Sequence, residues 1–280
     1  MGKTGCRGQE LVRHSFNPRS VTGFESLKAS YYDNHSLDSL DCYVTERFLN
    51  NSAEKERMEK LISLVPKEVE SLLDVGAGFG LFLHGLGSQR DILSEGVDVS
   101  KESMRWGLNR GLKLQLASAH ELPYGDQAFD MITCSEVLEH LTWGVYEESL
   151  REIARVAGRY VLISVPYDEK RGFAKCPYCG CKANPDYHMR SFDSSSLKGL
   201  IPGFELVNVE TICRLSIIYK LRPYLPLPWH AKLVCPACNY RDTKETDFLR
   251  SSRLAKVKAL LRGFPLPTVP RWIAGLYRRS

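Results

Sequence analysis

The segment Leu72–Gly80, LLDVGAGFG, joins an apolar run of strand length to three alternating glycines, and LFLHGL follows as the expected start of a helix. Glycine permits a tight turn and lets a ligand approach bare backbone, while the first turn of a helix offers free N–H groups. Asp98 ends the next apolar run, EGVDV, 24 residues after Asp74. A carboxylate at that place can accept hydrogen bonds from ribose hydroxyls. The pattern predicts a site for a nucleoside-bearing ligand; glycines that only let the helix pack on the sheet are the alternative.

Further apolar runs of strand length, such as FDMITCS and RYVLISV, alternate with helical patterns such as SMRWGLNRGL and YEESLREIARV. This alternation is typical of parallel βαβ units, so the predicted fold is α/β and doubly wound. Upstream, Ser52 is the expected N-cap of a helix whose apolar stripe includes Leu61 and Ile62 and which Pro66 closes. SSSLKGL is expected to form a later helix and FELVNVETI the strand after it.

The composition is that of an ordinary globular protein: the 280 residues are 43% apolar and 25% charged. Disorder, collagen and coiled coil are thereby excluded. No apolar run approaches the roughly 18 residues of a membrane span, and the N-terminal MGKTGCRGQE lacks the apolar stretch of a signal peptide. We therefore expect a cytoplasmic protein.

Enzymes that bind dinucleotides space the turn as G-x-G-x-x-G, whereas here G-x-G-x-G follows Asp74, which disfavours NAD. The chain resembles a class I S-adenosylmethionine-dependent methyltransferase of the small-molecule type, similar to ubiquinone-biosynthesis methyltransferases. LLDVGAGFG resembles the first motif of that family, VDVS its ribose acid, ELPYGDQAFDMITCSEVLEHL its adenine loop and fourth strand, and YVLISVPY its fifth strand. The resemblance covers about residues 55–167 and implies a Rossmann-like, mostly parallel seven-stranded sheet.

The resemblance also implies S-adenosylmethionine as the cofactor and assigns its contacts. Asp74 and the turn would hold the methionine part, Asp98 the ribose, and Val99 and Leu122 the adenine faces. The family often places an acid in the adenine loop, where this sequence has Ser118. The implied cofactor-binding positions are Asp74, Gly76, Ala77, Gly78, Gly80, Asp98, Val99, Ala119, Leu122 and, through its backbone, Cys134.

Methyl transfer to a hydroxyl requires removal of a proton, and a histidine near neutral pKa is a natural base. His140, in SEVLEHL beyond the predicted fourth strand, is the first candidate catalytic residue because it falls at the carboxyl edge of the sheet. Packing or capping of its helix is the alternative role. His188 and Tyr167 are weaker candidates. The position after the fourth strand reads CSEV rather than the Asn/Asp-Pro-Pro-aromatic run of adenine amino methyltransferases, which disfavours an adenine amine as target.

Two cysteine pairs, Cys176-x-x-Cys179 and Cys235-x-x-Cys238, each have Pro after the first Cys and could donate four thiolates to a tetrahedral zinc ion. Four thiolates leave no open coordination position, so the predicted zinc is structural and clips an insertion at 168–192 to the later part of the chain. Buried free thiols are the alternative. Cys181 and His188 are reserve ligands.

Three regions are expected along the chain: a lead segment or lid at 1–52, the catalytic domain at 53–240, and a basic tail at 241–280. The tail has ten Lys and Arg against three Asp and Glu. It could bind peripherally to anionic lipid or to nucleic acid. The alternative is a solvent-exposed helix without a binding role.

The predicted function is methyl transfer to a small-molecule acceptor, which could be a sugar, a lipid-linked intermediate or a secondary metabolite. One alternative is an RNA-modifying methyltransferase that binds nucleic acid through the zinc module and basic tail. The other is a zinc-stabilised binding protein without catalytic activity.

Overall fold

The computed structural model describes residues 37–184, 186–217 and 267–280, together with residues 220, 235, 237, 238 and 240. Its strands are β1 Ser71–Val75, β2 Leu93–Asp98, β3 Leu114–Leu116, β4 Phe129–Ser135, β5 Ala157–Pro166, β6 Ala174–Lys175, β7 Lys182–Ala183, β8 Phe204–Ser216 and β9 Thr268–Arg279. Its helices are α2 Leu37–Val44, η1 Thr45–Leu49, α3 Ser52–Ser63, α4 Leu81–Gly87, α5 Lys101–Leu108, η2 Leu138–His140 and α6 Val145–Val156.

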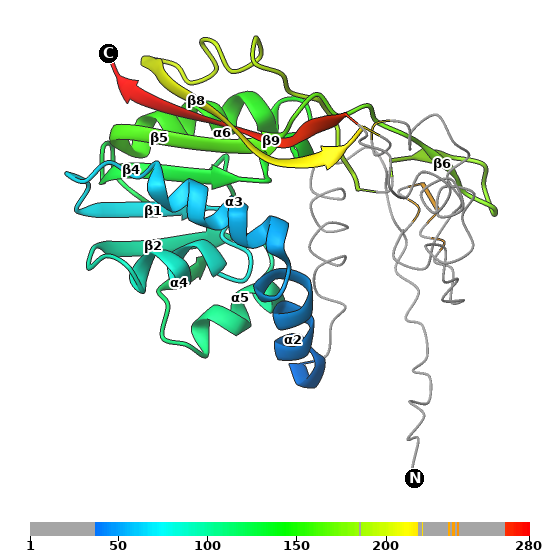
Figure 1. Ribbon diagram of the computed structural model, residues 1–280, viewed down its shortest axis with the longest axis horizontal. Helices are drawn as coiled ribbons and strands as arrows, with labels where there is room; N and C mark the ends of the chain where they lie inside the picture. Colours follow the sequence, from blue (N-terminus) through cyan, green and yellow to red (C-terminus); the bar gives the residue numbers. More distant parts are fainter. Residues whose placement is uncertain are drawn as a thin grey trace.

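Seven of the described strands form one twisted sheet in the order β3-β2-β1-β4-β5-β9-β8 (Figure 1). Neighbouring strands from β3 to β5 are parallel, and β9 is antiparallel to both β5 and β8. The predicted mostly parallel, seven-stranded α/β fold is therefore confirmed. The strand order reverses between β1 and β4, and open α/β sheets bind ligands at the carboxyl ends of the strands beside such a reversal.

Helices cover both faces of the sheet, as Figure 1 shows for α3 and α6. On one face, Leu61 and Ile62 of α3 and Leu83 of α4 belong to a buried cluster that also contains Leu72 and Met131 of the sheet. On the other face, α6 contributes to a second buried cluster. Strands that are covered on both sides read as near-continuous apolar runs, which explains why the sequence identified β1, β4 and β5.

Helix α3 begins one residue away from the expected cap. The side chain of Asn51, not of Ser52, accepts hydrogen bonds from the backbone N–H groups of Ala53 and Glu54, at 3.0 and 3.3 Å. Asn and Ser are comparable N-caps, so the sequence alone could not choose between the two neighbours.

The stretch SSSLKGL forms turns rather than the expected helix. Asp193 Oδ1 accepts hydrogen bonds from the backbone N–H and the hydroxyl of both Ser195 and Ser196. Gly199 follows with a positive φ of 64°. Side-chain to backbone bonds of this kind compete with helix formation.

The end of the predicted basic tail is a strand of the central sheet, so the expected boundary at 241 is wrong for residues 268–279. Trp272, Ile273 and Tyr277 of β9 are buried between β5 and β8. Arg279 donates to the backbone carbonyls of Ala154, Ala157 and Gly158, so this cation is used inside the fold. Pairing with β5, which lies about a hundred residues earlier, gave no local signal in the sequence.

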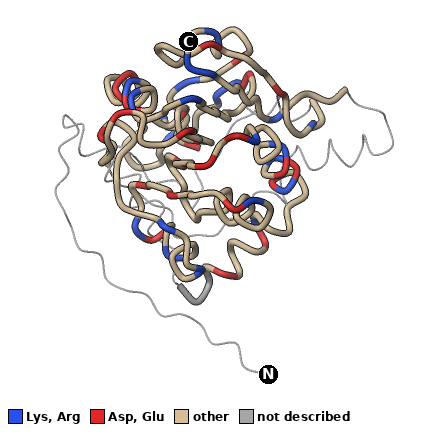
Figure 2. The backbone as a smooth tube through the Cα atoms, turned by 90° about the vertical axis from the view of Figure 1, so that its left-hand side faces the viewer, with Lys and Arg blue, Asp and Glu red and all other residues tan. Residues whose placement is uncertain are grey.

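Acidic and basic residues are interspersed along the described backbone in Figure 2. Seven of the ten cations of the predicted tail fall at 241–262, outside the described residues, as does the lead segment before residue 37. No helix within the described ranges has both the length and the apolar character needed to cross a bilayer.

Replacing Trp272 with Ala should lower the free energy of unfolding by about 3–5 kcal/mol, the usual cost of truncating a buried aromatic side chain. Urea unfolding measures this. Val207→Ala, on the exposed part of β8, is the control and should cost less than about 1 kcal/mol. Equal stability of the two variants would show that β9 is not part of the core.

Candidate functional site

The turn after β1 places three glycines at positive φ: 77° at Gly76, 52° at Gly78 and 76° at Gly80. A Cβ at Gly76 would lie 2.2 Å from Cγ2 of Val137, whereas a Cβ at Gly78 would meet nothing within 4 Å. Gly76 therefore allows the segment after β4 to lie directly against the turn. Gly78 borders open space, so a ligand can approach the bare backbone there.

Asp98, the last residue of β2, faces this turn. Its carboxylate accepts hydrogen bonds from the backbone N–H groups of Gly78 and Ser100, both at 2.8 Å. Val99, which follows it, is 37% exposed. The predicted ribose acid and the predicted glycine turn thus lie together, and Asp98 is only partly buried.

Asp74 is buried in the middle of the sheet, 4% exposed, at the end of β1. The hydroxyl of Thr133, its register partner on β4, donates to Asp74 Oδ1 at 2.6 Å. Burial raises the pKa of Asp74 to about 7; the Thr133 hydrogen bond acts to lower this pKa and the Asp98 charge to raise it. A cation placed beside Asp74 would favour its ionised form.

Three of the other residues predicted for cofactor binding, Ala119, Leu122 and Cys134, are buried. Ala119 and Leu122 are buried in the core, and the Ser118 hydroxyl lies 2.6 Å from Nδ1 of His120. The Cys134 side chain is fully buried, and burial raises the pKa of its thiol well above the usual value. This agrees with a contact through the backbone of Cys134 rather than through its sulfur.

The predicted insertion returns to the carboxyl edge and contacts η2. The backbone N–H of Met189 donates to the carbonyl of Glu139 at 2.6 Å, and Arg190 Nη1 donates to the carbonyls of Leu138 and Leu141. The rings of His140 and His188 meet edge to face, with centroids 4.7 Å apart. Two histidines that the sequence treated as separate candidates are therefore neighbours.

Arg57 was missed by sequence reasoning. It is 9% exposed on α3, pairs with Glu54 at 2.8 Å, donates to Ser135 Oγ at 3.1 Å and lies over the ring of Trp272. The available signal was its position, one turn before Leu61 on the buried stripe of the helix. Its charge acts to lower the pKa of Asp74, although less than burial raises it.

Thr133 and Glu139 were also not singled out. Thr133 could have been found from strand register, because parallel β1 and β4 bring it beside Asp74. Glu139 is adjacent to the candidate His140, but its almost complete burial, 1% exposed, had no sequence signal.

The four predicted metal-ligating cysteines come together beside β6 and β7. Sγ of Cys176 lies 3.8 Å from Sγ of Cys238, and Sγ of Cys179 lies 3.5 Å from Sγ of Cys235. Four sulfurs about 2.3 Å from a zinc ion at tetrahedral angles would be about 3.8 Å apart, so the donor set fits zinc. Cys181 lies outside this group. Burial acts to raise the pKa of Cys176, but backbone hydrogen bonds from Cys179 and Tyr178 bring it below its ordinary value.

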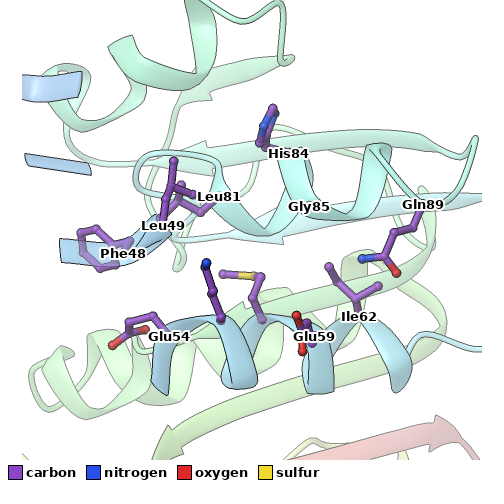
Figure 3. Close-up of a pocket in the computed structure, with 11 residues that line it drawn as sticks. Phe48, Leu49, Glu54, Glu59, Ile62, Leu81, His84, Gly85 and Gln89 are labelled. Carbon is purple, nitrogen blue, oxygen red and sulfur yellow. The ribbon is translucent and has the colours of Figure 1, made fainter. Parts of the chain in front are cut away.

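An apolar hollow of about 190 Å³ lies between α3 and α4 (Figure 3). Phe48, Met58 and Ile62 line it together with His84 and Leu81. None of its lining residues belongs to the glycine turn or to the Asp98 loop, so this hollow is separate from the predicted nucleoside site.

The described part of the lead segment lies against the glycine turn. The ring of Phe79 in that turn is 6.1 Å from Tyr43 of α2 and 5.7 Å from Phe48 of η1, measured between centroids. Leu40 and Val44 pack with Trp106 of α5 in the same cluster. A lid formed by residues 1–52 remains a hypothesis, which this location supports.

Comparison with known proteins identifies the central part of the chain. Residues 73–160 match the family model described as "Methyltransferase domain". They form a methyltransferase domain. The methyltransferase domain includes Asp74, the glycine turn, Asp98 and His140, so the family match and the geometry coincide on one edge of the sheet.

Two curated relatives illustrate the similarity. An uncharacterized protein of Methanocaldococcus jannaschii is 27% identical over 200 residues, which cover 69% of this chain and 81% of the relative. The 27-O-demethylrifamycin SV methyltransferase of Amycolatopsis mediterranei is 26% identical over 151 residues, 49% of this chain and 50% of that enzyme. The alignment with the rifamycin enzyme thus spans only half the length of that enzyme.

A solved structure shares the fold. It is Burkholderia thailandensis 1,6-didemethyltoxoflavin-N1-methyltransferase with bound 1,6-didemethyltoxoflavin and S-adenosylhomocysteine. The TM-score is 0.55 at 15% identity, over 96% of this chain and 93% of that one. At this sequence identity the similarity concerns the fold alone.

The raised pKa of Asp74 predicts that Asp74→Asn stabilises the ligand-free protein at high pH. The pKa is about 7 in the folded state against an ordinary value of 3.8. The free energy of unfolding of the wild type therefore falls as pH rises above 3.8, because ionisation of the buried carboxyl group opposes folding. It levels off above about pH 7. The advantage of the variant in free energy of unfolding should grow by roughly 2–3 kcal/mol between pH 5 and pH 8, measured by urea unfolding. Identical pH dependence in both proteins would contradict the assignment.

Proposed function

We propose that the chain transfers the methyl group of S-adenosylmethionine to a small-molecule acceptor. The observation that carries this proposal is the arrangement at the reversal between β1 and β4. There, open space above Gly78 lies beside the partly buried carboxylate of Asp98. A bare backbone turn next to a ribose-binding acid fits a nucleoside that carries an amino-acid chain.

Each predicted contact has a physical basis in this arrangement. Asp74 would hold the methionine ammonium, whose positive charge would favour the ionised carboxylate against the effect of burial. Gly76, Ala77, Gly78 and Gly80 would provide the cradle for the methionine part. Asp98 would bind the ribose diol, and Val99, Ala119, Leu122 and the backbone of Cys134 would border the adenosine.

Methyl transfer depends mainly on aligning the acceptor atom with the methyl group of the cofactor. The bound cofactor supplies an electrophilic methyl group, and holding the acceptor in line with it can contribute about 7–11 kcal/mol at best. If the acceptor is a hydroxyl, a base must take its proton. His140 is the proposed base, because η2 places it at the same edge of the sheet, with 17% of its side chain exposed.

A small-molecule acceptor is favoured over RNA. The relative of named activity is the 27-O-demethylrifamycin SV methyltransferase, whose name indicates a small-molecule acceptor. RNA binding usually requires a basic face, and the described backbone in Figure 2 shows both signs of charge interspersed. Seven of the ten cations of the predicted tail, at 241–262, lie outside the described residues.

We further propose that zinc joins the insertion to the later part of the chain through Cys176, Cys179, Cys235 and Cys238. The sulfur separations support a tetrahedral site, and four thiolates would leave the ion no open position. Such a site is structural. Because the insertion also carries His188, the clip would fix one wall of the acceptor site.

Binding of S-adenosylhomocysteine tests the proposed cofactor site. Gly76→Ala should weaken binding at least tenfold, because the new Cβ would displace Val137 and the turn. Gly111→Ala is the matched control, since Gly111 has a similar φ of 79° but faces open space away from the site. Asp98→Asn should weaken binding by a comparable factor through the ribose. Calorimetry measures all three, and unchanged affinity in both site variants would refute the proposal.

Metal analysis of protein purified without chelator should find at least one zinc ion per chain. Cys176→Ser should lose most of this zinc, since serine is a poor ligand for the soft site. Cys181→Ser, which alters a cysteine of the same insertion outside the cluster, should keep it. Zinc-free wild-type protein would end the hypothesis, and loss of zinc in Cys181→Ser alone would reassign the ligands.

A further inference from the structure

Apart from the cysteines, a second group of metal-ligating side chains lies at the carboxyl edge. Glu139, His140 and His188 each present one ligand atom, and these atoms all lie within 4.8 Å of one another. Glu139 and His140 are neighbours on η2, and His188 comes from the insertion. The fold therefore brings the third side chain to the other two. We propose that these three residues bind a divalent transition-metal ion, which in turn binds an oxygen of the acceptor.

The three side chains are largely shielded from water. Glu139 is 1% exposed, His188 12% and His140 17%. Burying a carboxylate is costly unless positive charge or hydrogen-bond donors accompany it. A dication between one carboxylate and two neutral imidazoles provides that charge.

His188 is oriented as metal-binding histidines usually are. Its Nδ1 is hydrogen-bonded to the carboxylate of Glu169, which leaves Nε2 as the nitrogen available to a metal. A carboxylate on the far side of the ring fixes the tautomer and makes the ligating nitrogen more basic. Glu169 therefore acts as a positioning residue for this site.

The backbone around His188 is fixed as well. Asn184 Oδ1 accepts hydrogen bonds from the backbone N–H groups of Asp186 and His188, both at 3.0 Å. Met189 N–H donates to the Glu139 carbonyl, which joins the insertion to η2 next to the cluster. The ligands from the two segments are thus held at a set separation, as a metal site requires.

Two imidazoles and one carboxylate suit Mn²⁺, Fe²⁺, Co²⁺ or Zn²⁺, and three protein ligands leave positions open for an exogenous oxygen. The cluster follows Val137, whose side chain contacts Gly76 of the turn. The ion would therefore lie between the cofactor site and the insertion.

The chemical consequence rests on the proposed function. An acceptor hydroxyl bound to the ion would lose its proton to solvent more readily, because the metal lowers the pKa of a bound oxygen. Its oxygen would then form a bond to the methyl carbon as the S–CH3 bond breaks, giving the methyl ether, S-adenosylhomocysteine and the released proton. In this role His140 is a metal ligand, and the metal takes over the activation that a free base would provide.

The test titrates Mn²⁺ into the full chain after dialysis against citrate, which leaves zinc on the thiolates, and counts free Mn²⁺ by electron paramagnetic resonance. The wild type should bind one Mn²⁺ per chain. Glu139→Gln and His188→Ala should weaken binding at least a hundredfold, and Glu169→Gln about tenfold. His84→Ala, an exposed histidine on α4, is the control and should leave it unchanged. Circular dichroism and zinc content check that each variant is folded.

Absence of Mn²⁺ binding to the wild type at millimolar concentration would overturn the inference, as would undiminished binding in both ligand variants. Parallel calorimetry with S-adenosylhomocysteine separates the two hypotheses. If the nucleoside binds and Mn²⁺ does not, only the metal site is wrong. If Mn²⁺ binds to these residues and the nucleoside does not, the metal site stands and the proposed transfer reaction falls.

Discussion

The close approach of Gly76 to Val137 is the constraint on which the rest of the site depends. With no side chain at Gly76, the segment after β4 lies against the turn after β1, and a Cβ there would come within 2.2 Å of Val137. That segment continues into η2, to which the insertion attaches through Met189 and Arg190. The proposed nucleoside site and the proposed acceptor side thus meet at this glycine contact beside the strand reversal.

Asp74 shows how function and stability conflict at the same place. A buried carboxyl group whose pKa is about 7 contributes little to folding and opposes it when ionised. Thr133 and Arg57 offset part of this cost, by a hydrogen bond and by charge. An apolar side chain would suit the core better, and the positive charge of the methionine group proposed to bind here would offset the cost of ionising the buried acid.

Patterns within short stretches of sequence predicted the elements whose structure depends mainly on neighbouring residues. The strand, turn and helix from Leu72 onward and the carboxylate of Asp98 follow from apolar runs and glycine spacing. The pairing of Cys176 and Cys179 with Cys235 and Cys238 followed from ligand chemistry. The sequence did not predict strand β9. Arg271, Arg278 and Arg279 gave this segment the composition of a basic tail, and the strands with which it pairs lie far away in sequence. The contact of His140 with His188 was not predicted either, because the two residues are distant in sequence and the fold of a long insertion brings them together.

The insertion itself is held at two ends, and this has a consequence for specificity. One part of it carries two of the clustered cysteines, and its C-terminal part contacts η2 through the backbone N–H of Met189 and the guanidinium group of Arg190. Residues between these anchors can change without moving the glycine turn or Asp98, which belong to the sheet. If the insertion forms the acceptor wall as proposed, the cofactor geometry can stay constant while that wall varies, so the insertion rather than the methyltransferase domain would determine the acceptor.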